Sequence, residues 1–221
     1  MHYIKMKHII LFSNIKCGEG KTTLCAHFCE YLIMKGFHVT AADADLQASL
    51  SRHRERELYE SPERPVPWDI TRLNTLDTET LKSDLKELRQ KDGIVVIDCP
   101  GNLNDNNLSV IYAMADLIVI PMAYDVDTID ATGLFVAVIR KMASARLVFL
   151  PNRINTTEGK ARELEMREET IAILGKLGTV TPRIKQSVVI KRYSTLQPLD
   201  KYQHAAVEHA FDRIIDELKH L

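Results

Sequence analysis

The sequence predicts an α/β fold: a doubly wound, mainly parallel sheet with helices on both faces. Short apolar runs alternate along the chain with segments whose apolar residues recur at helical spacing, and this alternation is typical of strand–crossover–strand units. Several apolar runs are continuous, which indicates strands that are buried on both faces. The chain has 221 residues, of which 45% are hydrophobic and 27% charged, so we expect one domain spanning residues 1–221.

The first predicted unit is a strand, a glycine-bearing loop and a helix. Residues 9–12 form an apolar run, residues 14–23 contain the loop, and residues 24–34 carry apolar side chains at helical spacing. In this context the N–H groups of the loop and the positive end of the helix dipole point at one small volume, which suits phosphates. Lys21 would reach the outer phosphates and the Thr22 hydroxyl would hold Mg²⁺, as in a P-loop NTPase fold. The alternative is a chance Gly-x-Gly-Lys-Thr string in a turn.

Two acidic residues follow the second predicted strand, residues 39–42. Asp43 and Asp45 stand at the carboxyl end of that strand, where parallel sheets place their ligands. At positions i and i+2 of an extended segment their carboxylates point to the same side. One can therefore hold the water shell of Mg²⁺ while the other orients an attacking water. A solvated acidic turn is the alternative interpretation.

A charged segment and a proline-rich loop come next. Residues 51–64 alternate arginine with glutamate, and this mixed sign favours a solvated helix face over a nucleic-acid patch. Three prolines, at positions 62, 65 and 67, then mark a surface loop, which we expect Trp68 to anchor on the body. Residues 76–88 return to helical periodicity and predict a crossover helix.

Asp98 ends the next buried strand, the β-branched run of residues 94–97. An acidic residue at the tip of an apolar strand, in a chain that already carries a phosphate loop, predicts a carboxylate that helps to hold the Mg²⁺ shell. A strand-end cap is the alternative. The later part of the chain continues the alternation, with helices predicted at 105–114, 127–142, 158–177 and 203–221 and strands at 117–121, 146–150 and 178–182.

The phosphate loop resembles a known variant of the P-loop. Residues 16–23 are similar to the deviant Walker A sequence KGGxGKTT of the ParA/MinD family, and Cys17 stands where that family has glycine. The resemblance implies that Lys16 reaches the nucleotide of a partner subunit. It also implies a set of nucleotide-binding residues in the loop, namely Cys17, Gly18, Glu19, Gly20, Lys21, Thr22 and Thr23.

Other segments resemble the same family in the same order. Residues 43–47 are similar to its DxDPQ segment, which implies that Asp43 associates with Mg²⁺ and that Asp45 activates water. Asp98 and Pro100 match its DxPP motif, whereas Gly101 departs from it. Residues 115–121 match its "ADLVLIP" phrase. Its adenine-side motif implies that Asn152 bonds the base with Arg153 nearby, and Pro182 begins a segment similar to the one that closes over the adenine.

The resemblance covers most of the chain and is greatest to the small, ParF-like partition ATPases. It implies ATP and Mg²⁺ as cofactors, catalysis by Lys16, Lys21 and Asp45, slow ATP hydrolysis, and an ATP-dependent homodimer or filament that acts in plasmid or chromosome partition or in cargo positioning. It also implies a ParB-like partner that stimulates hydrolysis. Two alternatives stay open: a nucleotide-gated scaffold with negligible hydrolysis, favoured if Cys17 deforms the loop, and a P-loop metabolite kinase or ligase, which needs an acceptor pocket.

Other binding partners are less well supported by the sequence. Many relatives carry an arginine where Ser187 stands, which argues against non-specific DNA binding, although four nearby basic residues could form a replacement patch: Arg183, Lys185, Lys191 and Arg192. The polar face of the closing helix mixes both charge signs, which disfavours an anionic membrane. No signal-type or spanning apolar run is present, so we expect a cytoplasmic protein.

Overall fold

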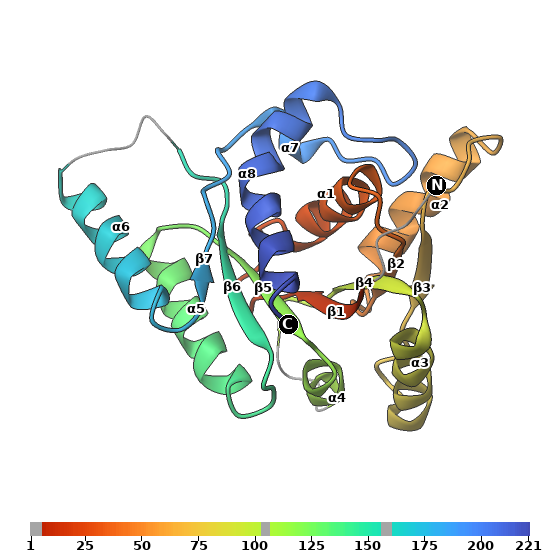
Figure 1. The fold of residues 1–221 in the computed structure, drawn as a ribbon, viewed down its shortest axis with the longest axis horizontal. Helices are drawn as coiled ribbons and strands as arrows, with labels where there is room; N and C mark the ends of the chain where they lie inside the picture. The colour runs from red at the N-terminus through yellow and green to blue at the C-terminus, as the bar shows by residue number, and fades with distance from the viewer. Residues whose placement is uncertain (1–5, 103–106, 156–160) are drawn as a thin grey trace.

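The computed structural model describes residues 6–102, 107–155 and 161–221. Its strands are β1 (Lys7–Phe12), β2 (Val39–Asp43), β3 (Asp69–Arg72), β4 (Gly93–Asp98), β5 (Leu117–Met122), β6 (Arg146–Pro151) and β7 (Thr179–Val180). Within the described residues these strands form one sheet in the order β3-β2-β4-β1-β5-β6-β7, and every neighbouring pair runs parallel (Figure 1). The order reverses direction on either side of β1, as in a doubly wound sheet, so the predicted fold class is confirmed.

Helices cover both faces of this sheet (Figure 1). One layer packs on the hydrophobic cluster that contains Ile10 and Phe12, and the other packs on the cluster that contains Ile9 and Leu11. The first layer comprises α1 (Lys21–Met34), α2 (Ser49–Glu60), α7 (Val188–Lys191) and α8 (Lys201–Leu218). The second comprises α3 (Thr78–Gln90), α4 (Leu108–Ala113), α5 (Val126–Ile139) and α6 (Ala161–Leu174).

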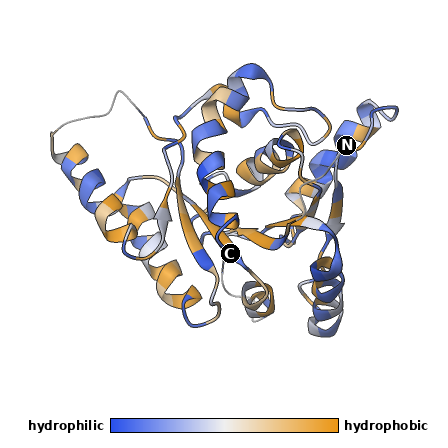
Figure 2. Ribbon diagram, viewed as in Figure 1, coloured by the Kyte–Doolittle hydropathy of each residue, from blue (hydrophilic) through white to orange (hydrophobic). Residues whose placement is uncertain are grey.

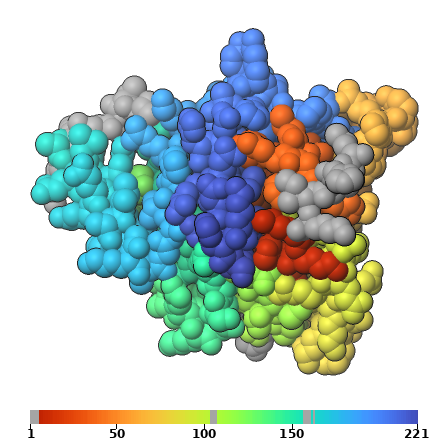
Figure 3. All heavy atoms as spheres, viewed as in Figure 1, coloured from red at the N-terminus to blue at the C-terminus, as the bar shows by residue number. Residues whose placement is uncertain are grey.

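The core follows from the pattern of the strands. Successive side chains of β1 point to opposite faces, so its four apolar residues supply both hydrophobic clusters, and each is almost fully buried. The central strands are accordingly apolar along their length, while the outer side of α3 is hydrophilic (Figure 2). The last helix, α8, lies across the middle of the face that Figure 3 turns to the viewer. No helix in the described ranges has the length and apolar character needed to span a bilayer.

The structure refines several expectations about the elements. The sequence analysis places no strand after Trp68, but residues 69–72 form β3, a polar edge strand that pairs only with β2 in the described sheet. The charged segment forms a helix over Ser49–Glu60 that ends before the prolines, which the sequence predicts to mark a surface loop. The helices expected at 127–142 and 158–177 end at Ile139 and Leu174.

Parts of two predicted helices fall outside the described residues, namely 105–106 of the helix expected at 105–114 and 158–160 of the helix expected at 158–177. The proline-rich loop does lead into an anchor, because the Trp68 side chain is buried in the cluster under α1. Gly93 begins β4 with a φ of 101°, and a Cβ there would lie 2.3 Å from the carbonyl oxygen of His38, so only glycine fits.

Candidate functional site

The phosphate loop wraps the N-terminus of α1. Gly18 and Gly20 both adopt left-handed conformations, with φ values of 86° and 84°. Gly20 is the N-cap of α1, no side chain caps the helix there, and its first turn contains no acidic residue. Backbone N–H groups and the positive end of the helix dipole are therefore left facing the loop, as anion binding requires.

Two lysines of the loop take different positions. The Lys21 side chain is buried, and its Nζ donates to the carbonyl oxygen of Lys16 at 3.1 Å. Lys21 thus folds back over the loop, where its charge faces the volume that phosphates would fill. Lys16 extends away from the loop, and its Nζ lies 3.8 Å from Oδ2 of the exposed Asp127.

Two buried carboxylates lie side by side under the loop. Asp43 and Asp98 are register partners at the carboxyl ends of β2 and β4, and each is about 1% exposed. Oδ2 of Asp43 accepts a hydrogen bond from the Ser51 N–H at 2.9 Å, and Oδ1 accepts a long one from the Asp45 N–H at 3.3 Å. Burial raises the pKa of Asp43 above its ordinary value, and these hydrogen bonds oppose the rise.

Asp98 differs from Asp43 in the hydrogen bonds that its carboxylate accepts. Among the described residues, no donor makes a hydrogen bond of regular geometry to either of its carboxylate oxygens, although the Thr22 hydroxyl lies beside them. Burial raises the pKa of Asp98 to about 7, against the influence of Thr22 and Lys21. An unpartnered carboxylate in this position costs free energy, so the site suits a cation that would satisfy it.

Thr22, Asp43 and Asp98 suit an Mg²⁺ ion that binds together with the phosphates of a nucleotide. Mg²⁺ is usually held by one or two carboxylates together with water and substrate phosphate oxygens. The described residues contain no group of three or more His, Cys, Asp or Glu side chains that could hold a metal ion by themselves. The ligand set of Thr22, Asp43 and Asp98 therefore matches a nucleotide-dependent metal site better than a permanent one.

Asp45 stands at the rim of the site. It is partly exposed, and its Oδ1 accepts a hydrogen bond from the Gln47 N–H at 2.9 Å, which holds the turn before α2. The second carboxylate oxygen of Asp45 takes no part in that turn. The acidic pair lies at the end of one strand, where the sequence analysis expects it, but the support that Ser51 gives to Asp43 was not anticipated.

The predicted adenine-side residues lie against the phosphate loop. Nδ2 of Asn152 donates to the Glu19 carbonyl at 2.8 Å, and Nη1 of Arg153 donates to the Gly18 carbonyl at 2.7 Å. Arg153 reaches the loop from a left-handed backbone conformation, with φ of 59°. A Cβ at Gly20 would lie 3.0 Å from Nδ2 of Asn152, so the glycine also permits this close approach. Asn152 and Arg153 thus hold the loop in addition to facing the neighbouring cavity.

That cavity has a volume of about 310 Å³. It is lined by Gly18, Gly20 and Thr23 of the phosphate loop and α1, by Asn152 and Arg153, and by residues 185–187 and 190–191. Pro182 is exposed and does not line it, although the segment that Pro182 begins does. The sequence analysis missed Ile190 and Lys191 as lining residues, because α7 is too short to give a periodic signal.

Glu19 is a buried acidic residue of the phosphate loop. It is 5% exposed, and its Oε2 has no hydrogen-bond partner among the described residues. Burial raises the pKa of Glu19, the charge of Arg153 lowers it, and that of Asp125 raises it again.

Comparison with known proteins identifies the family. The profile of the CobQ/CobB/MinD/ParA nucleotide binding domain matches residues 10–195. The chain belongs to this family. The match takes in the phosphate loop, both buried carboxylates, Asn152, Arg153 and α7, so the resemblance to ParA/MinD-type proteins is confirmed.

Solved structures of this kind share the fold over nearly the whole chain. A plasmid partition protein of Borrelia burgdorferi bound to AMPPNP has a TM-score of 0.74 at 19% identity, covering 96% of this chain and 100% of its own. An ATP complex of McdA from Cyanothece has a TM-score of 0.73 at 17% identity, covering 98% of each chain. MinD in the MinC:MinD complex of Aquifex aeolicus has a TM-score of 0.72 at 17% identity, with 95% and 96% covered.

A curated relative matches over a shorter stretch. A protein of Rhizobium rhizogenes, described as a replication protein A, is 54% identical over 43 residues, which are 20% of this chain. The match spans only 11% of the length of that relative.

Proposed function

We propose that the protein is an ATP-dependent dimerisation switch with slow ATPase activity, acting in plasmid or chromosome partition or in the positioning of another cargo. The observation that carries the proposal is the unpartnered, buried Asp98 beside Asp43 and Thr22, directly under a phosphate loop. Such a carboxylate is costly unless a bound cation satisfies it, and a nucleotide brings that cation. Structures of the same fold contain AMPPNP or ATP.

Each residue has a role that follows from its position. N–H groups of residues 17–23 and the charge of Lys21 bind the phosphates of ATP. Thr22, Asp43 and Asp98 would hold Mg²⁺, which supplies charge neutralisation on the phosphate oxygens when bound. Asp45, with one carboxylate oxygen outside its own turn, orients the attacking water. Catalysis of this kind consists mostly of positioning and charge stabilisation, which suits a slow rate.

Dimerisation is assigned to Lys16. Its side chain leaves the loop, and within the described ranges its ammonium group makes one long, exposed ion pair, with Asp127, which is worth little. Lys16 is therefore free to contact the phosphates of a second subunit, and only a triphosphate would extend far enough to meet it. A ParB-like partner that stimulates hydrolysis and non-specific DNA are further binding partners under this proposal, with Arg183, Lys185, Lys191 and Arg192 as the candidate DNA surface.

The test is molar mass by light scattering with ATP–Mg²⁺, with ADP–Mg²⁺ and without nucleotide. Asp45→Ala keeps the bound state from hydrolysing and serves as the trapped form. A dimer or filament seen only with ATP supports the switch, and the rate of phosphate release then separates an ATPase from a scaffold with negligible hydrolysis. A monomer in all three conditions would overturn the switch.

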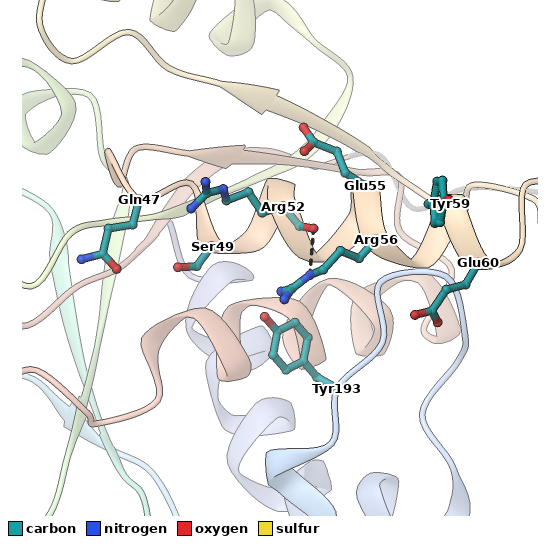
Figure 4. Close-up of a pocket in the computed structure, with 8 residues that line it drawn as sticks. All are labelled: Gln47, Ser49, Arg52, Glu55, Arg56, Tyr59, Glu60 and Tyr193. Atoms are coloured by element: carbon teal, nitrogen blue, oxygen red, sulfur yellow. Dashed lines mark hydrogen bonds between the residues drawn. The ribbon is translucent and has the colours of Figure 1, made fainter.

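One observation favours a second candidate, a P-loop kinase or ligase that acts on a metabolite. A groove of about 840 Å³ runs along α2 beside the Asp45 turn, with Gln47, Ser49, Arg52, Arg56 and Tyr193 among its lining residues (Figure 4). Glu55 and Glu60 also line the groove, but no carboxylate in the described part of the chain lies within ion-pair distance of Arg52 or Arg56, so these arginines could hold an anionic group of an acceptor. ATP turnover by a monomer, lost in Arg52→Ala and Arg56→Ala variants, would favour this candidate.

A further inference from the structure

A partly buried polar network joins α2 to the segment that follows α7. Glu57 of α2 accepts three hydrogen bonds from that segment: Oε1 accepts from the Ser194 hydroxyl at 2.5 Å, and Oε2 accepts from the Thr195 N–H at 2.7 Å and from its hydroxyl at 2.5 Å. Burial alone would raise the pKa of Glu57, but these hydrogen bonds hold it below its ordinary value. Glu57 is therefore ionised at neutral pH and grips the segment through charge-assisted bonds.

Arg54, one turn earlier, holds the same segment from the other side. Its Nε donates to the Thr195 hydroxyl and its Nη2 donates to the Thr195 carbonyl, both at 2.7 Å. Nη1 donates to the Trp68 carbonyl at 2.9 Å, and the guanidinium lies 4.5 Å from the centre of the Trp68 ring. Only 6% of Arg54 is exposed. The backbone of Thr195 is thus bound at both its N–H and its carbonyl.

Residues 193–195, which Arg54 and Glu57 bind, follow shortly after α7, and α7 lines the cavity beside the phosphate loop. Ile190 and Lys191 line that cavity and belong to α7, a single helical turn that ends at Lys191. Tyr193 stacks on His53 of α2 with ring centres 4.2 Å apart, and its hydroxyl end faces Ser49 and Arg56 across the groove (Figure 4). One turn of helix has little stability of its own. His27 and Gln203 bond its carbonyl groups on the side of α1 and α8, and the segment that Arg54 and Glu57 bind holds its C-terminal side.

The first turn of α2 is in turn fixed to the candidate metal site. The Ser51 N–H donates to Asp43, so this helix begins at the buried carboxylate and, two turns later, grips Thr195. Arg54 is buried and the Glu57 side chain is 20% exposed, so charged groups at these positions are an expensive way to gain stability, because apolar residues of similar size pack without the cost of desolvation. Their advantage is a fixed geometry, here between the metal side and the base side of one cavity.

We propose that Arg54 and Glu57 are positioning residues for the bound nucleotide: they hold residues 193–195, and thereby α7, as the base-side wall of the cavity. The inference rests on the proposed function, because it assumes that the cavity takes a nucleotide. Neither side chain lines the cavity itself. Their effect is therefore on how long the nucleotide stays rather than on how it first enters.

The test compares Glu57→Gln with Glu55→Gln, a matched control on the same helix whose side chain is 64% exposed and forms an ion pair only with Arg72 among the described residues. The probe is a fluorescent ADP analogue, followed by stopped flow for association and release, with hydrogen exchange measured on residues 188–196. Glu57→Gln keeps one acceptor oxygen and puts an NH2 group in place of the other, so Ser194 and Thr195 can no longer both donate to this side chain. We expect about tenfold faster release, association within about twofold, and faster exchange in 188–196.

Further variants separate positioning from general loss of stability. Ser194→Ala removes the hydroxyl that donates to Glu57 and accepts from the N–H groups of residues 196 and 197. It leaves both Thr195 bonds to Glu57 in place, so it should speed release about threefold. Leu85→Ala destabilises the opposite face of the sheet and should leave release unchanged at a similar thermal midpoint.

The outcomes distinguish this inference from the proposed function. A wild-type protein that fails to bind the analogue overturns both. A wild-type protein that binds it, with release unchanged in Glu57→Gln and Ser194→Ala, overturns the positioning role alone. Equal acceleration in Leu85→Ala would also overturn it, because a general loss of stability would then account for the effect.

Discussion

Cys17 of the phosphate loop packs directly on Gly101, its Sγ lying 3.8 Å from the Gly101 carbonyl oxygen. A Cβ at position 101 would lie only 2.9 Å from that sulfur. These are the two positions at which the loop and the segment after β4 depart from the sequences they resemble, and the structure places them in contact. The extra side chain at one position occupies the space left by the missing side chain at the other. Beside this contact, Gly18 and Gly20 both adopt left-handed conformations.

The contact predicts that substitutions at 17 and 101 are coupled. Gly101→Ala should weaken ATP binding several-fold in the wild-type background, because the new methyl group pushes on Cys17. In a Cys17→Gly background the same substitution should be nearly neutral. We expect a coupling of about 1 kcal/mol in a double-mutant cycle, measured by equilibrium binding of a fluorescent ATP analogue. Additive effects would show that the two residues vary independently.

Asp98 predicts a conflict between stability and function. Asp98→Asn removes the buried charge, so the ligand-free protein should gain about 1 kcal/mol at pH 8, a rise in Tm of roughly 2–4 °C for a chain of this size. Its affinity for ATP should lose most of its dependence on Mg²⁺, a loss of about 10–100-fold. Calorimetry and nucleotide titration with and without EDTA measure the two effects. A less stable Asp98→Asn variant would contradict the buried, unpartnered carboxylate.

The same residue fixes a direction for pH dependence. The pKa of Asp98 in the folded chain, about 7, lies above its ordinary value of 3.8, so the folded state binds the proton more tightly than the unfolded state. Its contribution to stability is complete below pH 3.8 and is lost as the pH rises through 7. Tm of the ligand-free protein should therefore fall between about pH 6 and 8, and less so in Asp98→Asn. Saturating ATP–Mg²⁺ should reduce the fall.

Lys16 predicts a separation of dimerisation from binding. Lys16→Ala should abolish the ATP-dependent increase in molar mass while leaving the affinity of the monomer for ATP within about threefold, since Lys16 does not lie over its own loop. Asp127→Asn is the matched control, because it removes the exposed partner of Lys16 and should change neither quantity. Dimers that survive Lys16→Ala would exclude a role across the interface.

The sequence was informative wherever function depends on neighbours in the chain. The phosphate loop, the acidic pair after β2 and the tip of β4 are local patterns, and parallel strands bring their ends together by topology alone. β3 was missed because its Asp-Ile-Thr-Arg sequence is polar, as an edge strand permits. The grip of Arg54 on Thr195 joins residues 141 positions apart, and nothing in either segment specifies its partner. Such a contact follows only from the packed fold.

Trp68 offers a local measurement of another buried carboxylate. Its indole N–H donates to Oε1 of Glu30 at 2.8 Å, and it is the only tryptophan in the chain. Burial raises the pKa of Glu30 from 4.5 to about 7, while the Trp68 hydrogen bond and the charge of Arg54 oppose that rise. Glu30 therefore changes charge beside the indole near neutral pH. The fluorescence of the folded protein should titrate with a midpoint near 7.

Folding raises the pKa of Glu30, so the stability of the folded state should fall as Glu30 loses its proton. Protonated Glu30 stabilises the folded state below pH 4.5, and this contribution is lost as the pH rises through 7. Glu30→Gln keeps an acceptor for the indole and removes the charge, so its fluorescence should be flat between about pH 6 and 8. Glu217→Gln, on α8, is the control and should titrate as wild type does, because Glu217 bonds Arg146 and Thr179 instead. A midpoint that persists in Glu30→Gln would assign the titration to another group near Trp68.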